Sequence, residues 1–155
     1  MGENFDFFVG ACDSALWMSR CNFYQLGRYH LCCAVSRQHR LAQYASLEIE
    51  DLYGERLLMV ARDDSLSNDM VRDELETNHP QIAIEDMPYF YDIGVFNDCE
   101  QSNSVLLTLD IWADVHPSLV TIPVHWNYTV PFGLLYSLQP SESVICFLDA
   151  VKNLT

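Results

Sequence analysis

Basic residues are scarce in this sequence. Eight Lys and Arg stand against 22 Asp and Glu in 155 residues, so the formal net charge is −14. Binding to a nucleic-acid duplex requires clustered Lys and Arg, and the sequence contains no such cluster. The composition therefore argues against a nucleic-acid-binding surface on this chain, and it disfavours an anionic membrane surface for the same reason.

The sequence also lacks a secretory leader and long apolar runs. Residues 1–10 carry acidic groups and no basic segment, and no apolar stretch is long enough to span a bilayer. We therefore expect a cytoplasmic chain with no membrane partner. Half of the residues are nonetheless hydrophobic and 19% are charged, which is typical of one folded domain or of two small lobes.

The six cysteines form no recognisable metal or redox motif. No CxxC pair occurs. Cys32 and Cys33 are adjacent in an apolar run, so in a strand their side chains point to opposite faces and cannot share one metal ion. Without a secretory leader, buried reduced thiols are favoured over disulfides. We expect no cofactor and no metal.

The middle of the chain alternates apolar segments of strand length with amphipathic helical segments. The pattern predicts strands over 56–61, 81–85, 104–109 and 119–124, and helices over 67–78, 92–101 and 111–115. Continuous apolar strands that alternate with helices are typical of an α/β fold with a mostly parallel sheet flanked by helices. Ligands of such sheets bind at the carboxyl ends of the strands.

The two ends of the chain do not continue this alternation. We expect strands over 5–10 and 29–35 with an irregular segment between them, then a strand over 132–138 and a helix that begins near Pro140. Two strands and one helix form a poor core on their own. Either these ends pack on the central unit, or they belong to a lobe that is incomplete here or is completed by another chain.

Several segments, in their order and spacing, resemble the regulatory domain of the LysR-type transcriptional regulators. The segments are Asp6-Phe-Phe-Val-Gly10, His39-Arg-Leu-Ala42, Ile49-Glu-Asp-Leu-Tyr-Gly-Glu-Arg-Leu58, His116-Pro-Ser-Leu-Val-Thr-Ile-Pro-Val124 and Phe147-Leu-Asp-Ala-Val151. Arg40 departs from the family pattern, because proline is usual at that position. The resemblance covers nearly the whole chain.

This resemblance implies a periplasmic-binding-protein-like fold of type 2, in which two crossover strands join two α/β lobes around a small-molecule effector. Within an effector-binding domain of 1–155 it implies one complete lobe, lobe two, at about 46–131. It also implies an incomplete lobe one at about 1–38 and 139–155, with crossover strands near 29–35 and 133–138. The helix-turn-helix that binds DNA would lie upstream of this sequence.

The function that the resemblance implies is effector sensing in a bacterial transcriptional regulator. The effector would control the DNA-binding state of the parent protein, the domain would not be an enzyme, and self-association is expected because regulatory domains of this family pair. Two alternatives remain open. One is a Cys/His-dependent enzyme that uses Cys32 or Cys33 with His30 or His39, although these residues lack a nucleophile elbow. The other is a free-standing solute-binding protein, which the missing leader disfavours.

Candidate effector contacts follow from the ends of the predicted strands. They are Cys12, Asp63, Ser65, Tyr89, Tyr91, Thr108, Asp110 and Trp126. Asp63, Asp92 and Asp110, taken singly, are better explained as helix N-caps. Because such carboxylates would already fill the anion sites at the helix N-termini, we expect a neutral or cationic effector, held by the aromatic rings of Tyr89, Tyr91 and Trp126.

Overall fold

The structure, a computed structural model, describes residues 5–87 and 92–154. In chain order the elements are β1 (Phe7–Ala11), α1 (Ala15–Met18), β2 (Asn22–Ser36), the 3-10 helices η1 (Arg40–Gln43) and η2 (Ile49–Leu52), β3 (Arg56–Met59), α2 (Leu66–Asn78), β4 (Ala83–Asp86), α3 (Ile93–Ser102), β5 (Val105–Leu109), the 3-10 helix η3 (Asp110–Trp112), β6 (Leu119–Pro123), β7 (Thr129–Tyr136) and α4 (Glu142–Lys152).

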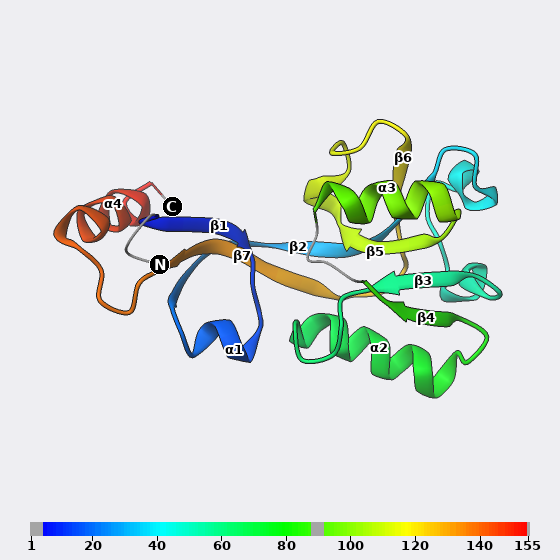
Figure 1. Ribbon diagram of the computed structural model, residues 1–155, viewed down its shortest axis with the longest axis horizontal. Helices are drawn as coiled ribbons and strands as arrows, with labels where there is room; N and C mark the ends of the chain where they lie inside the picture. Colours follow the sequence, from blue (N-terminus) through cyan, green and yellow to red (C-terminus); the bar gives the residue numbers. More distant parts are fainter. Residues whose placement is uncertain (1–4, 88–91, 155) are drawn as a thin grey trace.

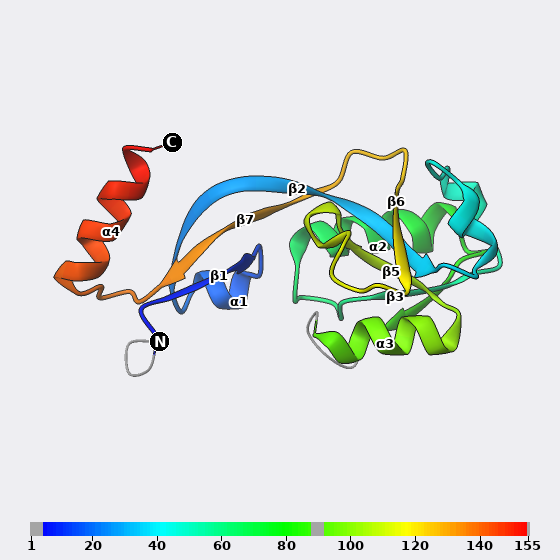
Figure 2. The ribbon, with the colours of Figure 1, turned by 90° about the horizontal axis from the view of Figure 1, so that it is seen from above.

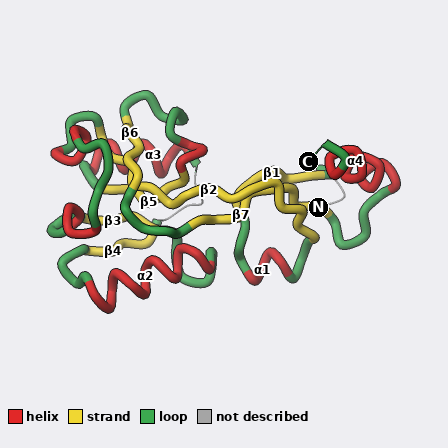
Figure 3. The backbone as a smooth tube through the Cα atoms, turned by 180° about the vertical axis from the view of Figure 1, so that it is seen from behind, coloured by secondary structure: helices red, strands yellow, loops and turns green. Residues whose placement is uncertain are grey.

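The molecule is elongated and consists of two parts (Figure 1). The larger part, residues 31–128, holds β3 to β6 with α2 and α3. The smaller part, which is the rest of the described chain, holds β1, α1 and α4, and both ends of the described chain lie in it. The strands β2 and β7 run between the two parts, as Figure 3 shows from behind.

One seven-stranded sheet continues through both parts in the order β1-β7-β2-β5-β3-β4, with β6 paired to β2. This arrangement of sheet and helices confirms the expected α/β class. The sheet is mixed, however, rather than mostly parallel. Only β3 runs parallel to its neighbours β4 and β5, whereas the pairs β1–β7, β2–β7, β2–β5 and β2–β6 are antiparallel. The reason is that β2 and β7 pass between the two parts in opposite directions and pair along the way.

The long strand β2 belongs to both parts. Residues 22–30 pair with β7, and residues 31–36 pair with β5 and β6. Every residue of 31–36 is buried, whereas most of 22–30 is half-buried or exposed. The apolar pattern therefore predicted only the inner half of this strand, over 29–35. The segment predicted to be irregular is in fact strand from Asn22 onward.

The core of the larger part lies on both faces of its sheet. On one face Leu57 and Met59 pack with Leu75 of α2, and on the other Leu58 packs with Phe96 of α3. Figure 1 shows α2 and α3 on opposite sides of the strands. This double coverage is why β3 and β5 are apolar at successive positions.

Two features of the helices differ from what their sequence suggests. Met70 of α2 is exposed although it is apolar, and Arg72 is buried, because its guanidinium donates to the Val60 carbonyl at 2.9 Å and the Asp86 carboxylate at 2.6 Å. The predicted helix over 111–115 is a single 3-10 turn that begins at Asp110. Only a few residues separate this turn from Pro117, which is too short a stretch for a stable α-helix.

The smaller part is a three-stranded ribbon with apolar side chains on both faces. Leu134 packs against Val144 and Leu148 of α4, whereas the next residue, Leu135, packs on the other face with Cys12. Figure 2, seen from above, shows α4 at the outer end of this ribbon. The isolated segments that the sequence predicted at the two ends of the chain thus pack on one another.

Gly133 permits the close pairing of β7 with β2 in this ribbon. A Cβ atom at this position would lie 2.1 Å from the carbonyl oxygen of Tyr24, next to the irregularity in register between Gln25 and Gly27. Only glycine lets the two backbones approach so closely.

Candidate functional site

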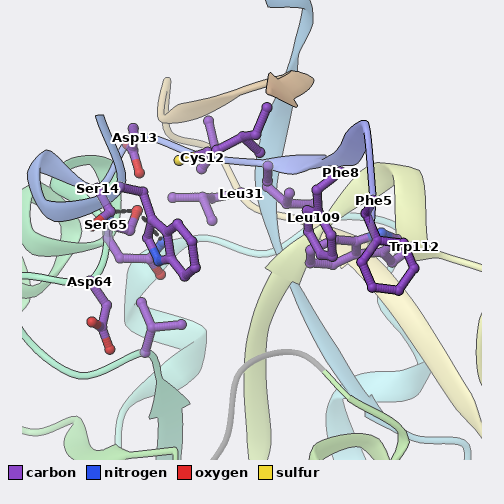
Figure 4. A pocket seen from close by; sticks show the side chains of 16 residues that line it. Phe5, Phe8, Cys12, Asp13, Ser14, Leu31, Asp64, Ser65, Leu109 and Trp112 are labelled. Carbon is purple, nitrogen blue, oxygen red and sulfur yellow. Dashed lines mark hydrogen bonds between the residues drawn. The ribbon is translucent and has the colours of Figure 1, made fainter. Parts of the chain in front are cut away.

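A cavity of about 470 Å³ lies between the larger and the smaller part, which is a volume typical of small-molecule sites (Figure 4). It is lined by Phe5, Phe8, Ala11, Cys12, Asp13, Ser14, Trp17, Val130 and Leu135 from the smaller part and by Leu31, Val60, Asp64, Ser65, Asn68, Leu109 and Trp112 from the larger part. Both parts therefore contribute to one continuous wall.

Three polar lining residues lie on the opposite side of the cavity from two of the aromatic ones. Figure 4 shows Asp13, Ser14 and Ser65 together on one side, with Asp64 below them. Phe8 and Trp112 lie on the other side. This separation suits a ligand with one polar end and an apolar body.

Two turns bring the polar side chains together. The chain leaves β1 at Ala11 and turns into α1, and it leaves β3 and turns into α2. At the second turn, the Ser65 hydroxyl caps α2 by accepting the backbone N–H of Asn68 at 3.3 Å and its side-chain amide at 2.9 Å. Ser65 and Asn68 are both buried, so the start of α2 forms a fixed polar wall.

The carboxylate of Asp13 joins the first turn to this wall. Its Oδ2 atom accepts the backbone N–H of Ser67 at 2.8 Å, and the Ser67 hydroxyl lies 2.5 Å from the same oxygen. Its second oxygen, Oδ1, is buried and has no hydrogen-bond partner, and the same holds for Oδ1 of Asn68. Two buried acceptors therefore remain unpaired among the residues that line the cavity.

Two of the sequence-predicted contacts, Cys12 and Ser65, line this cavity. Asp63 lies outside the lining, although its neighbour Asp64 belongs to it. Asp63 has a left-handed backbone with φ of 72°, and its N–H donates to the carboxylate of Asp69 at 3.1 Å. It is not the N-cap of α2, which is Ser65.

The other predicted contacts lie elsewhere. Thr108 is fully buried in β5 with an unpaired hydroxyl, Asp110 is exposed beside the ring of His30 at 3.4 Å, and Trp126 donates its indole N–H to the Leu31 carbonyl at 2.7 Å. None of the three belongs to the cavity lining. Tyr89 and Tyr91 fall outside the residues that the structure describes.

The caps also differ from those expected for the aspartates. Asp92 caps α3 by accepting the backbone N–H of Val95 at 3.1 Å, as predicted. Asp110 makes no cap, because it is the first residue of the 3-10 turn η3 rather than the residue before it.

Several lining residues were not predicted from the sequence. Phe5, Phe8 and Trp17 carry no local signal for a site, because their place in the lining depends on how the smaller part folds against the larger one. Asn68 could have been found, since it is three residues after the cap Ser65, where a polar side chain reaches back to the cap.

Cys32 and Cys33 do not have the environment of a nucleophile. Burial, with the nearby charge of Asp110, raises the pKa of Cys32 to about 11, and burial also raises the pKa of Cys33. The His39 ring contacts Glu55 at 3.1 Å and accepts the N–H of Leu41. Both thiols thus stay protonated at neutral pH, which disfavours the Cys/His enzyme. Five cysteines are buried as expected, but Cys146 is exposed.

Two further findings concern the described residues alone. They contain no helix that is long and apolar enough to cross a bilayer. They also contain no group of three His, Cys, Asp or Glu side chains arranged to hold a metal ion.

Comparison with known proteins identifies the family. Residues 3–85, more than half of the chain, match the model of the LysR substrate binding domain, and the chain therefore belongs to this family. No curated protein sequence matches the chain at a significant level. The family assignment agrees with the resemblance noted in the sequence.

Solved structures show the same fold at low sequence identity. The regulatory domain of CcmR from Synechocystis PCC6803, in complex with 2-PG, has a TM-score of 0.68 and 12% identity over 98% of this chain and 74% of that chain. The effector binding domain of QuiR, in complex with shikimate, has a TM-score of 0.70 and 16% identity over 95% and 70%. The oxidized form of OxyR has a TM-score of 0.60 and 18% identity over 93% and 68%.

Proposed function

We propose that this chain is the effector-sensing domain of a bacterial transcriptional regulator, and that a small metabolite binds in the cavity between its two parts. The observation that supports this most directly is that the cavity wall comes from both parts, so a bound molecule would stabilise one relative arrangement of them. A ligand shifts the equilibrium between two arrangements of the parts only if it binds one arrangement more tightly than the other. A site that both parts form changes when the parts move, so the affinity for the ligand would differ between the arrangements.

The two parts correspond to the lobes that the family resemblance implies. We assign residues of about 46–131 to lobe two, and about 1–38 and 139–155 to a partial lobe one, with the difference that residues 31–36 of β2 pair inside the larger part. The crossover strands are β2 and β7, which connect the parts and pair from Asn22 and Tyr136 to His30 and Thr129. An effector in the cavity would act on the angle between these lobes.

The same proposal concerns the parent protein. Effector binding would control its DNA-binding state in the cytoplasm, and DNA would be contacted through a helix-turn-helix outside these residues. We also propose self-association of the domain, since large apolar side chains outside the cavity lining, such as Val9, Leu138 and Phe147, are about half exposed or more. Light scattering that gives a monomer at high concentration would contradict the self-association.

A thermal-shift screen of small metabolites tests the effector site. A ligand that binds only the folded state raises its melting temperature, and the stabilisation grows with the logarithm of the ligand concentration relative to its dissociation constant. Ala11→Phe, which would fill the cavity, is expected to abolish the shift, whereas Ile145→Phe on the exposed side of α4 is the matched control and is expected to retain it. A hit that Ala11→Phe binds unchanged would show that the effector binds elsewhere.

A further inference from the structure

We infer that Asp13 and Ser67 form a releasable latch between the two parts, and that the Ser67 hydroxyl transfers its hydrogen bond to the carbonyl oxygen of Thr129 when the latch opens. The inference rests on the proposed function and deepens it, because it names the contact that holds one arrangement of the two parts. In the second arrangement the Asp13 carboxylate is in water and the Ser67 hydroxyl donates to Thr129 alone.

A narrow neck joins the two parts. Tyr29 pairs with Val130 and His30 with Thr129, and among the described residues no third strand lies beside these two pairs. On one side of the neck β7 also pairs with β1, and on the other side β2 also pairs with β5 and β6. Thr129 is the first residue of β7, and hinges commonly lie at the ends of elements. A rotation of one part against the other would therefore take place at this neck.

In the described arrangement the latch crosses from one part to the other with two hydrogen bonds. Oδ2 of Asp13 accepts the backbone N–H of Ser67 at 2.8 Å and the Ser67 hydroxyl at 2.5 Å. Hydrogen bonds to a carboxylate are shorter and stronger than those between neutral groups. These two bonds hold the turn after β1 against the first turn of α2.

The Ser67 hydroxyl has two acceptors for its single hydrogen. Its oxygen also lies 2.9 Å from the carbonyl oxygen of Thr129, and a hydroxyl donates only one hydrogen. Thr129 directly follows Tyr128, the last residue of the larger part, so its carbonyl stays beside Ser67 if the smaller part rotates. The hydroxyl therefore keeps an acceptor in both arrangements. The Thr129 carbonyl keeps a donor as well, because Nη2 of Arg28 donates to it at 2.9 Å.

The closed latch leaves one polar atom unsatisfied. Oδ1 of Asp13 is buried and has no hydrogen-bond partner among the described residues. A carboxylate oxygen that is buried without a hydrogen bond has lost its hydration, and release of Asp13 into water restores it. Closing the latch therefore gains the bonds from Ser67 but sacrifices the hydration of Oδ1. Such a balance is the property of a two-state element that a ligand in the cavity can bias.

The distance between two spin labels tests the latch without any ligand. Cys146 on α4 is exposed and the other five cysteines are buried, and Thr77→Cys adds an exposed thiol on α2 in the larger part. Double electron–electron resonance between nitroxides at these two positions reports the arrangement of the parts. We expect the labelled Thr77→Cys protein to show one main distance, with about 10% or less of the molecules at a second distance.

Three further substitutions in this labelled protein separate the roles of the two residues. Asp13→Ala removes both bonds of the latch, and we expect it to raise the population at the second distance at least threefold. Ser67→Ala is expected to raise this population by less than half as much, because it removes the hydroxyl from both arrangements and retains the backbone N–H. Asp64→Ala, at an exposed carboxylate of the same cavity wall, is the matched control and should leave the population unchanged.

Circular dichroism establishes that each variant is folded. If Asp13→Ala does not fold, Asp13→Asn takes its place, because the amide retains the shape of the side chain and accepts weaker hydrogen bonds. It is expected to raise the second population by an amount between those of Ser67→Ala and Asp13→Ala.

The outcomes separate the latch from the proposed function. A folded Asp13 variant with the distances of the labelled Thr77→Cys protein would overturn the latch. Equal increases in Ser67→Ala and Asp13→Ala would overturn the transfer of the hydroxyl to Thr129. Neither result concerns ligand binding, which the metabolite screen tests. A screen without a hit that Ala11→Phe abolishes would contradict the effector site, while the spin-label distances would still decide whether the latch exists.

Discussion

Asp13 and Ser67 are 54 positions apart in the sequence, and one carboxylate oxygen of Asp13 accepts both the backbone N–H and the hydroxyl proton of Ser67. Asp13 belongs to the smaller part and Ser67 to the first turn of α2 in the larger part. The carboxylate is also favoured by the partial positive charge of the helix N-terminus. This contact therefore links the two walls of the cavity.

A double-mutant cycle measures the strength of this link. We expect Asp13→Asn and Ser67→Ala each to lower the free energy of unfolding by about 1–3 kcal/mol, because each removes hydrogen bonds to a charged acceptor in a partly buried place. The double variant should lose less than the sum of the two, with a coupling of about 1–2 kcal/mol. Urea denaturation provides the measurement, and additive losses would show that the two side chains do not stabilise each other.

Leu58 tests the assignment of β3 to the interior of the sheet. Leu58 is 7% exposed between β4 and β5, so Leu58→Asp would bury an unpaired carboxylate, and we expect a loss of about 4 kcal/mol or more and no cooperative unfolding transition. Met70→Asp, at a side chain that is 60% exposed on α2, is the control and should unfold within about 0.5 kcal/mol of the wild type. Cooperative unfolding of Leu58→Asp with unchanged circular dichroism would show that β3 is not central.

Gly133 tests the close approach of β7 to β2. We expect Gly133→Ala to cost about 2–3 kcal/mol or more, because its Cβ would overlap the Tyr24 carbonyl and force the ladder apart. Gly27→Ala is the matched control on the partner strand, since no atom lies within 4 Å of a Cβ placed there. The melting temperatures of the two variants are compared by thermal unfolding. Equal values would contradict the described pairing of β7 with β2.

We expect the folded protein to lose stability at high pH because of the thiol of Cys32. Its pKa is raised from 9.0 to about 11, chiefly by burial, so between these values the unfolded chain loses the proton while the folded chain keeps it. The unfolded state then binds fewer protons, and the free energy of unfolding falls by up to about 1.4 kcal/mol per pH unit above pH 9.

Two alanine variants isolate this contribution. Cys32→Ala should have a shallower decline between pH 9 and 11 than the wild type, while Cys146→Ala, at the exposed cysteine, should decline as steeply as the wild type. Urea denaturation at stepped pH values follows the slope. A Cys32→Ala slope identical to that of the wild type would show that this thiol titrates alike in both states.

The sequence was informative where a segment is buried on both sides. The apolar run over 56–61 corresponds to β3, because Leu57, Leu58 and Met59 are all buried. The helix over 67–78 corresponds to α2, although its apolar pattern matches its burial only in part, since Val71 and Leu75 are buried and Met70 is exposed. The outer half of β2 was missed for the opposite reason. Its residues pair only in a ribbon with one neighbour, so they remain half-buried and show no continuous apolar pattern.

The candidate site was only partly predictable. Cys12 and Ser65 could be placed because each follows a strand end, which is a local feature. Whether Thr108 or Trp126 faces the cavity depends on strand orientation and on packing between elements far apart in the sequence. The unpaired acceptor of Asn68 is a property of the assembled wall, and no sequence pattern reports it.

The antiparallel pairing of β2 with β7 also determines the order in which the two parts would unfold under tension. Both ends of the described chain lie in the smaller part, so along the backbone tension applied to them reaches the larger part through these two strands. Once β1 has left β7 and the Asp13–Ser67 contact has broken, the ladder would open one residue pair after another, from Asn22 and Tyr136 toward His30 and Thr129. The larger part would then stay folded while the smaller part is pulled open.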